Sequence, residues 1–213
     1  MQRVVIFSGG QLGEWALAEI QEHDLIIGAD RGAWFLLEHD IRPDIALGDF
    51  DSVNAGQLGI IREKSGQFFA CDPVMKDLTD TEMAFDTALK LRPAPSEIVL
   101  CGAIGTRFDH TLANVHLLRR AVEQGIPCRI CGEKNEIRLI DSRTVIRKSR
   151  FTHVSLLPFT LTVAGINLQG FQYPLVDATL QIGQSLGISN MITADEGEIT
   201  ISSGLLLVIQ SSD

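Results

Sequence analysis

The segment Ile45-Ala46-Leu47-Gly48-Asp49-Phe50-Asp51-Ser52 joins a short apolar run to a loop that carries two carboxylates. A short apolar run bounded by turn signals is typical of a buried strand. In open α/β sheets, ligands bind outside the carboxyl ends of such strands. The segment therefore predicts a parallel α/β fold with Asp49 and Asp51 at its ligand-binding edge.

The surrounding sequence, residues 1–133, repeats this alternation between short apolar runs and helical patterns. Such alternation indicates a parallel sheet covered by helices on both faces, a three-layer α/β domain. The expected strands are 4–7, 24–29, 45–47, 67–70, 97–100 and 127–131. The expected helices are 14–21, 31–39, 57–64, 79–91 and 110–123. The helix over 79–91 has the clearest signals, because Thr79 and Glu82 fit a capping box and Pro93 ends the pattern.

Beyond residue 133 the helical periodicity disappears. Short alternating runs separated by glycine and proline indicate an antiparallel sandwich or barrel. The expected strands are 136–140, 144–146, 153–157, 161–163, 166–168, 198–201 and 205–209. We therefore expect two domains, an α/β domain over residues 1–133 and an antiparallel β-sandwich over residues 134–213.

Composition narrows the function classes. A formal net charge of −9 disfavours nonspecific binding to nucleic acid or to an acidic membrane surface. No apolar run approaches the roughly 20 residues that span a bilayer, and no signal peptide is visible, so we expect a cytoplasmic protein. Cys128 and Cys131 have C-x-x-C spacing, but a zinc site needs two more ligands, and we interpret them as ordinary buried thiols.

Three acidic clusters carry the chemical signal: Gly48–Ser52, then Lys76-Asp77-Leu78-Thr79-Asp80, then Arg107-Phe108-Asp109-His110. Together they hold five carboxylates with basic residues between them. Mg²⁺ prefers oxygen ligands and is commonly shared between carboxylates and substrate phosphates, while basic side chains face the remaining phosphate oxygens. The pattern favours Mg²⁺ chemistry on a phosphorylated substrate.

Each cluster also has a purely structural interpretation. On extended backbone, Asp49 and Asp51 share one face and Phe50 packs on the other, but a polar loop with Ser52 as a turn residue fits too. Acidic residues at a helix start, such as Asp77 and Asp80, offset the helix dipole without any ligand. His110 at a helix start is more often a structural hydrogen-bonding group than a proton carrier.

Glycine-rich turns follow three of the expected strands. They are Ser8-Gly9-Gly10, Gly28-Ala29-Asp30-Arg31-Gly32 and Gly102-Ala103-Ile104-Gly105. Glycines allow backbone amides to approach phosphate, and a helix start adds a favourable dipole. Each turn alone is a weak signal, and Asp30 could simply cap the next helix. Together the turns would line a nucleotide crevice.

Taken together, these residues resemble the thiamine pyrophosphokinase (thiamine diphosphokinase) family in its bacterial form. The resemblance includes the segments 28–33, 48–52, 76–80, 105–110, 155–158, 170–175 and 189–190. It implies a homodimer whose α/β domain binds ATP and Mg²⁺ and whose β-sandwich domain helps to form a thiamine site at the subunit interface. It also implies transfer of a diphosphate from ATP to the thiamine hydroxyl, with release of AMP. Two departures, Thr106 and Met191, bear on details of thiamine affinity.

With this resemblance, each candidate residue receives an expected role. The Mg²⁺–triphosphate shell, direct or through water, is assigned to Asp49, Asp51, Asp77 and Asp80, and the catalytic set adds Arg107 and Asp109. ATP contacts are expected from Asp30, Arg31, Lys76, Thr79, Arg107 and His110. Thiamine contacts are expected from Tyr173, Ser189 and Asn190. The alternatives are a pyrophosphokinase acting on another alcohol such as a hydroxymethyl pterin, a non-catalytic nucleotide sensor, and a metal-dependent phosphohydrolase.

Overall fold

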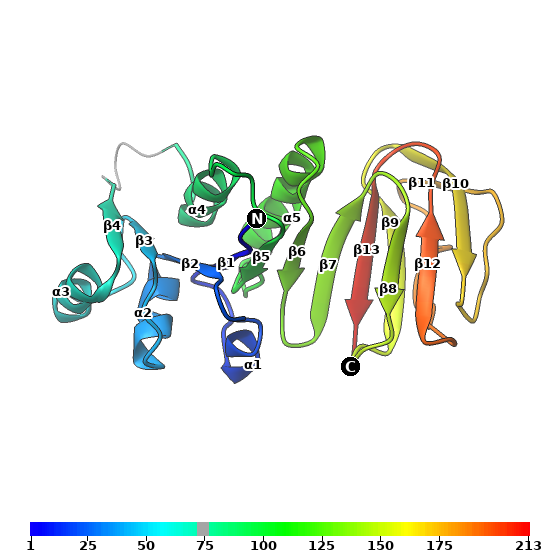
Figure 1. Cartoon of the computed structure of the whole chain (residues 1–213). Coiled ribbons are helices and arrows are strands. Elements are labelled where there is room, and N and C mark those ends of the chain that lie inside the picture. The colour runs from blue at the N-terminus through cyan, green and yellow to red at the C-terminus, as the bar shows by residue number, and fades with distance from the viewer. Residues whose placement is uncertain (72–76) are drawn as a thin grey trace. The chain divides into compact units, whose positions relative to one another are not determined.

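The computed structural model describes residues 1–71 and 77–213. The chain divides into two compact units, Met1–Glu133 and Lys134–Asp213 (Figure 1). Across these described ranges, no helix combines the length and the apolar character needed to cross a bilayer.

The first unit is a parallel sheet between two layers of helices. Its strands are β1 (Val4–Phe7), β2 (Leu25–Ala29), β3 (Ile45–Gly48), β4 (Gln67–Ala70), β5 (Ile98–Cys101) and β6 (Cys128–Cys131). Their order is β4-β3-β2-β1-β5-β6, and every pair is parallel. The helices are α1 (Glu14–Leu17), α2 (Arg31–Glu38), α3 (Ala55–Lys64), α4 (Asp80–Leu89) and α5 (Phe108–Glu123). In Figure 1, α4 and α5 lie over one face of the sheet, and α1 and α2 lie over the other.

This strand order places a crevice at the centre of the sheet. The chain leaves β1 toward β2, β3 and β4, and then returns to the other side of β1 as β5. The loops that follow β1 and β5 therefore run in opposite directions, which is the switch point where open α/β sheets bind ligands. β1, β3 and β5 are buried at every residue, which explains why their sequences are uninterrupted apolar runs.

All five predicted helices are present, with ends that differ from the prediction by up to four residues. α1 ends at Leu17, and residues 18–20 continue as turns, so the predicted helix over 14–21 is too long. α4 has only half of the predicted capping box: the Thr79 hydroxyl accepts from the Glu82 amide at 3.1 Å, while the Glu82 carboxylate accepts from Arg120 at 3.2 Å. A complete capping box instead begins α3, between Asn54 and Gln57.

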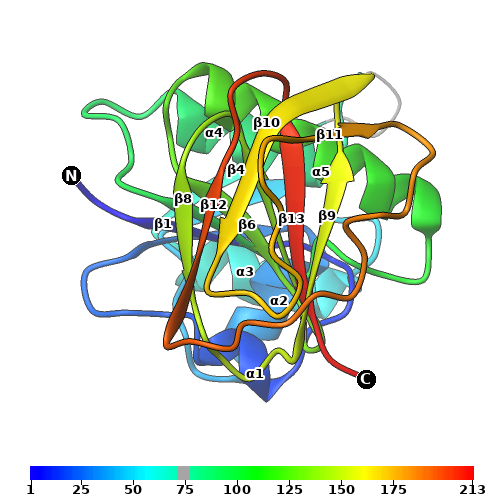
Figure 2. The same ribbon diagram turned by 90° about the vertical axis from the view of Figure 1, so that its right-hand side faces the viewer.

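The second unit is built from antiparallel strands in two sheets. The strands are β7 (Asn135–Ile140), β8 (Thr144–Arg147), β9 (His153–Pro158), β10 (Thr162–Gln169), β11 (Ala178–Gln181), β12 (Glu196–Thr200) and β13 (Leu206–Ser211). In one group β13 pairs with β7 and β9, and in the other the order is β11-β10-β12-β8. Figure 2 shows β8, β12 and β10 beside one another in that order.

Two predicted strands, 161–163 and 166–168, form the single strand β10. Its register shifts between Val163 and Ile166, and Gly165 adopts a positive φ of 68°. The glycine therefore marks a bulge within a strand, where the sequence predicted a turn between two strands. β11 was not predicted.

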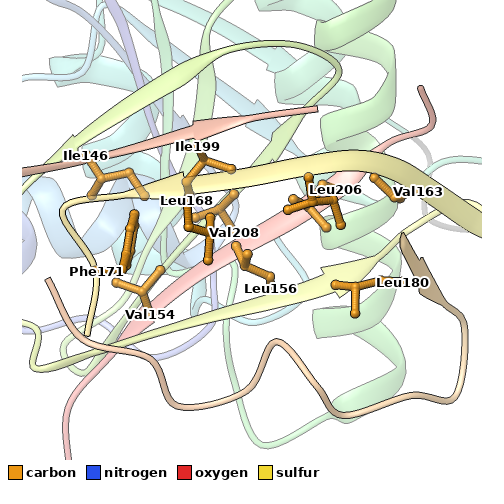
Figure 3. Close-up of a cluster of buried hydrophobic side chains, with 11 residues drawn as sticks. Ile146, Val154, Leu156, Val163, Leu168, Phe171, Leu180, Ile199, Leu206 and Val208 are labelled. Atoms are coloured by element: carbon orange, nitrogen blue, oxygen red, sulfur yellow. The ribbon is translucent and has the colours of Figure 1, made fainter. Parts of the chain in front are cut away.

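The core of the second unit lies between its two sheets. Both sheets contribute buried side chains to it (Figure 3): Ile146, Val154, Leu156, Val163, Ile166, Leu168, Phe171, Leu180, Ile199, Leu206 and Val208. A sandwich core of this kind explains the alternating burial along β9 and β13. The predicted fold class, a parallel α/β unit followed by an antiparallel β unit, is confirmed.

The cysteines carry no disulfide. Cys101 and Cys131 are buried, and burial raises the pKa of the Cys101 thiol to about 12. Burial also raises the pKa of Cys128 above its usual range. Cys131 Sγ lies 2.6 Å from Arg129 Nη1 on the same strand. The Cys101 and Cys128 thiols are therefore protonated at neutral pH, as buried cysteines commonly are.

Candidate active site

A cavity of about 700 Å³ opens at the carboxyl ends of the parallel strands in the first unit. Loops that follow β1, β2, β3 and β5 line it, together with the first turns of α4 and α5. Its wall carries five aspartates: Asp30, Asp49, Asp51, Asp77 and Asp80. The cavity therefore occupies the switch point and concentrates carboxylates there.

Three of these carboxylates form a close group. Asp30, Asp49 and Asp51 each place one carboxylate oxygen within 4.8 Å of the others. Asp30 follows β2, and the other two follow β3, its parallel neighbour in the sheet. Like charges this close repel one another unless a cation or a hydrogen-bond donor lies among them.

Within the described part of the chain, the protein satisfies only one oxygen of the Asp30 carboxylate. Asp30 is 9% exposed, and its Oδ2 accepts a hydrogen bond from the Ser52 hydroxyl at 2.5 Å. Its Oδ1 is buried and has no hydrogen-bond partner among the residues that the structure describes. Burial raises the pKa of this carboxyl, and the Ser52 hydrogen bond opposes that rise. A buried acceptor without a donor calls for an external ligand, and an all-oxygen set of this kind fits Mg²⁺.

The loop after β3 differs from the extended backbone that the sequence predicted. Phe50 adopts a left-handed conformation with φ 57°, so the chain turns between the two aspartates, and the Asp51 amide donates to Asp49 Oδ1 at 3.2 Å. Extended backbone at this loop was therefore a wrong prediction. The packing role of Phe50 is confirmed, because its ring is 3% exposed and stacks on Phe68 at 5.0 Å between centroids.

Gly48 has little room for a side chain. Its φ is 141°, and a Cβ there would lie 2.9 Å from Asp80 Oδ1 and 3.2 Å from the Asp30 amide nitrogen. The Asp80 carboxylate accepts from the Asp49 amide at 3.2 Å, which ties the first turn of α4 to the loop after β3. Close approach of these three segments is therefore possible because residue 48 is glycine.

The second acidic cluster contributes to the wall without joining the close group. Asp77, Thr79 and Asp80 line the cavity, but among the described residues the three-carboxylate group does not include Asp77 or Asp80. Thr79 uses its hydroxyl to cap α4, so its position follows from helix formation. Lys76, a predicted phosphate contact, lies outside the described residues.

The third cluster lies at the start of α5. Arg107 and His110 line the cavity, whereas Asp109 and Arg31 are not part of its wall. Arg107 forms two hydrogen bonds with Asp109, Nε to Oδ1 at 3.3 Å and Nη2 to Oδ2 at 2.6 Å. Both side chains are mostly exposed, and the Arg107 partner lowers the pKa of the Asp109 carboxyl. The guanidinium is therefore held at the cavity mouth by an exposed carboxylate.

Two polar residues of α5 support this wall and were missed by sequence reasoning. Asn114 is buried, lines the cavity and donates from Nδ2 to the Ala103 carbonyl at 2.8 Å. Thr111 Oγ1 accepts from the Gly105 amide and donates to the Arg107 carbonyl, both at 3.2 Å. The i, i+4 spacing from His110 to Asn114 is the sequence signal that could have placed Asn114 on the cavity face.

The glycine turns pack closely across the switch point. The Gly10 and Gln11 amides donate to the carbonyls of Gly102 and Ile104, both at 2.8 Å. A Cβ on Gly10 would lie 2.6 Å from the Ile104 carbonyl oxygen. Gly9, Gly10, Gly102 and Gly105 line the cavity, and their role in binding a nucleotide stays a prediction.

The predicted thiamine contacts lie together in the second unit. Tyr173 is 59% exposed, whereas Asn190 is 6% exposed. The Asn190 side chain accepts from the Tyr173 amide at 3.0 Å and donates to the Tyr173 carbonyl at 2.7 Å. Ser189 adopts a positive φ of 60°, and its amide donates to Ser155 Oγ at 3.1 Å. Asn190 thus holds the backbone of Tyr173, while the tyrosine ring faces solvent.

Two family models match this chain, one within each of its two units. Residues 17–130 match the family model described as thiamin pyrophosphokinase, catalytic domain, and residues 143–206 match thiamin pyrophosphokinase, vitamin B1 binding domain. The chain belongs to the thiamine pyrophosphokinase family. The resemblance expected from the sequence is therefore confirmed.

Individual members of the thiamine pyrophosphokinase family agree with this assignment. A Bacillus subtilis thiamine pyrophosphokinase is 33% identical over 194 residues, which cover 90% of this chain and 89% of that protein. The crystal structure of thiamine pyrophosphokinase from Bacillus subtilis superposes with a TM-score of 0.91 at 30% identity and covers both chains completely. The Geobacillus thermodenitrificans structure gives a TM-score of 0.87 at 32% identity, covering 100% of this chain and 98% of that one.

Proposed function

We propose that the chain transfers a diphosphate group from ATP to the hydroxyl of thiamine, giving thiamine diphosphate and AMP. Family membership over both units supports the reaction. The structural observation that supports the reaction most directly is the cavity at the switch point, which is lined by five aspartates, Arg107 and His110. Diphosphate transfer requires mainly positioning and charge neutralisation, and these residue types supply both.

The carboxylates provide the charge pattern for a divalent cation. Asp49, Asp51, Asp77 and Asp80 would hold Mg²⁺ directly or through water, and the unpartnered oxygen of Asp30 would add a further ligand. Bound Mg²⁺ supplies neutralisation of the charge on the phosphate oxygens. The role of the protein is to fix these oxygens in advance, through the Asp49 amide on Asp80 and the Ser52 hydroxyl on Asp30.

Basic side chains and backbone amides would stabilise the negative charge on the triphosphate that the cation does not neutralise. Arg107 presents a planar guanidinium at the cavity mouth, and release from Asp109 would let it bind phosphate with two hydrogen bonds. The amide-lined turns and the first turns of α4 and α5 favour an anion as well. We assign further ATP contacts to Asp30, Arg31, Lys76, Thr79 and His110, and we propose that Asp109, once freed, orients the attacking hydroxyl.

Thiamine recognition is proposed for the second unit. The thiazolium ring is cationic, so the exposed aromatic face of Tyr173 suits it better than a basic surface would. Asn190 fixes the Tyr173 backbone, and Ser189 and Asn190 are the proposed contacts to the pyrimidine. The match of residues 143–206 to a vitamin B1 binding domain supports this assignment.

The proposed setting of the enzyme is a cytoplasmic homodimer with Mg²⁺ as cofactor and ATP as co-substrate. No nucleic-acid or membrane partner is proposed, in keeping with the net charge of −9. The alternative acceptor, a hydroxymethyl pterin, is not favoured, because the second unit matches the vitamin B1 binding domain of the family. A nucleotide sensor without activity is not favoured either, because both units match an enzyme family.

An acceptor panel tests the proposal. The purified protein is incubated with ATP and Mg²⁺, and separately with thiamine, with a hydroxymethyl pterin and without an acceptor, and AMP is quantified. The proposal predicts that AMP forms in the incubation with thiamine and not in the other two. If AMP forms only with the hydroxymethyl pterin, the acceptor is the pterin and the proposal is wrong. Release of free pyrophosphate or phosphate without an acceptor would indicate a hydrolase.

A further inference from the structure

Ser52 lines the cavity and has been assigned neither as a metal ligand nor as a substrate contact. Its hydroxyl donates to Asp30 Oδ2 at 2.5 Å, across 22 residues of sequence. Ser52 itself is exposed, so its side chain does not fill the core. This contact joins the loop after β3 to the end of β2.

Asp30 is held at two points. Its amide donates to the Leu47 carbonyl at 2.9 Å, which extends the pairing of β2 with β3 by one residue. Its carboxylate is held through Oδ2 by Ser52. The backbone between these points has φ 49° and ψ −120°, a conformation that non-glycine residues rarely adopt. With the backbone and one oxygen fixed, the direction of the second oxygen is fixed too.

The Asp30 carboxylate also belongs to the close acidic group. Asp30 Oδ1 is buried without a hydrogen-bond partner among the described residues, and the carboxylates of Asp30, Asp49 and Asp51 come within 4.8 Å of one another. A buried carboxylate oxygen that lacks a donor is costly unless a ligand completes it. A side chain that orients a metal ligand through its other oxygen commonly affects metal affinity nearly as much as the ligand itself.

We propose that Ser52 is a positioning residue whose hydroxyl aims Asp30 Oδ1 at the divalent cation beside Asp49 and Asp51. Asp30 is then a direct oxygen ligand, and Ser52 acts only through it. The Asp30 carboxylate without this hydroxyl can rotate about its side-chain torsions and withdraw from the group. The inference rests on the proposed function for the identity of the cation, but its test does not use turnover.

The test measures Mn²⁺ binding to the nucleotide-free protein through the paramagnetic resonance signal of free Mn²⁺. Ser52→Ala should weaken binding by about 10- to 100-fold, the usual cost of removing the partner of a metal ligand. Ser52→Thr keeps a hydroxyl and should restore most of the affinity, whereas Ser52→Val has the same shape without the hydroxyl and should not. Wild-type affinity in Ser52→Ala and Ser52→Val would overturn the proposal.

A double-mutant cycle separates action through Asp30 from a general effect. In an Asp30→Asn background, Ser52→Ala should cost little further affinity, because the partner through which it acts is already lost. An equal loss in both backgrounds would contradict the proposal. Ser142→Ala is the matched control, since Ser142 Oγ donates to the Asp141 carboxylate at 2.9 Å in the other unit and should leave Mn²⁺ affinity unchanged.

Two further readouts keep the outcomes distinct. The metal-free unfolding midpoint of each variant shows whether a loss of Mn²⁺ affinity reflects a damaged fold, and a Thr–Val difference at equal midpoints can come only from the hydroxyl. Thiamine diphosphate formation by the wild-type protein is measured separately. If no thiamine diphosphate forms but the Mn²⁺ pattern holds, the proposed function fails and the role of Ser52 stands.

Discussion

The candidate residues of the two units differ in how their polar atoms are satisfied. In the first unit, Asp30 Oδ1 is buried without a donor among the described residues, and the Asp30 side chain belongs to a group of three carboxylates. In the second unit, the buried amide of Asn190 bonds to both backbone groups of Tyr173 and to the Met191 amide. The first arrangement is incomplete without a ligand, and the second is complete by itself. Chemistry is therefore expected from the first unit and substrate recognition from the second.

The largest effect is expected from Asp51→Asn. This change keeps the shape of the side chain but removes a charge from the three-carboxylate group. Loss of a metal ligand should cost several kcal/mol of transition-state stabilisation, so AMP release with thiamine should fall by about 100-fold or more. Asp141→Asn makes the same chemical change at an exposed turn of the second unit and serves as the control. Normal turnover by Asp51→Asn would contradict the assignment of the chemistry to the carboxylates of the first unit.

Asn190→Ala should have the next largest effect, and on a different quantity. The change leaves the Tyr173 amide and carbonyl without their side-chain partner, and the site is nearly buried. Loss of these hydrogen bonds should lower the free energy of unfolding by about 1–3 kcal/mol. Urea denaturation measures this loss, and Mn²⁺ affinity should stay unchanged. A loss of Mn²⁺ affinity at unchanged stability would contradict the separation of roles.

Tyr173→Ala should act on thiamine alone. An exposed aromatic face stabilises a bound cation by about 0.5–2 kcal/mol, so the KM for thiamine should rise roughly 2- to 30-fold while the KM for ATP stays constant. Tyr173→Phe retains the ring and should behave like the wild-type protein. Equal increases in both KM values would argue against stacking.

The smallest effect is expected from the exposed ion pair of Glu198 with Arg143, whose Oε2 and Nη2 atoms lie 2.7 Å apart. Arg143 lowers the pKa of the Glu198 carboxyl, so the stabilisation is present above the unfolded-state pKa and is lost as pH falls through the folded-state value. Melting temperatures of the wild-type protein and Glu198→Gln should differ slightly near pH 7 and converge in acid. A difference in melting temperature that grows as the pH falls would contradict a stabilising ion pair.

Sequence reasoning succeeded where local pattern decides the structure. Buried runs such as Val4–Phe7 predicted the parallel strands, and the position of Asp49 after one such run predicted its place at the cavity. Strand ends meet at one edge of a parallel sheet, so a short segment is enough to place such a residue.

It failed where distant segments decide the local structure. The left-handed turn at Phe50 comes with stacking on Phe68, and the Ser52–Asp30 contact spans 22 residues. The bulge at Gly165 depends on pairing with β11, which was not predicted. Likewise, the hydrogen bonds between Asn190 and Tyr173 join segments 17 residues apart and appear only in the fold, while the contact of Asn190 with thiamine stays a prediction.

The location of the cation in crystals grown with Mn²⁺ and a non-hydrolysable ATP analogue tests the central claim most directly. We expect an anomalous scattering peak at the carboxylates of Asp30, Asp49 and Asp51, with the analogue's phosphates beside it. A peak elsewhere on the chain, with none among these three carboxylates, would contradict the account.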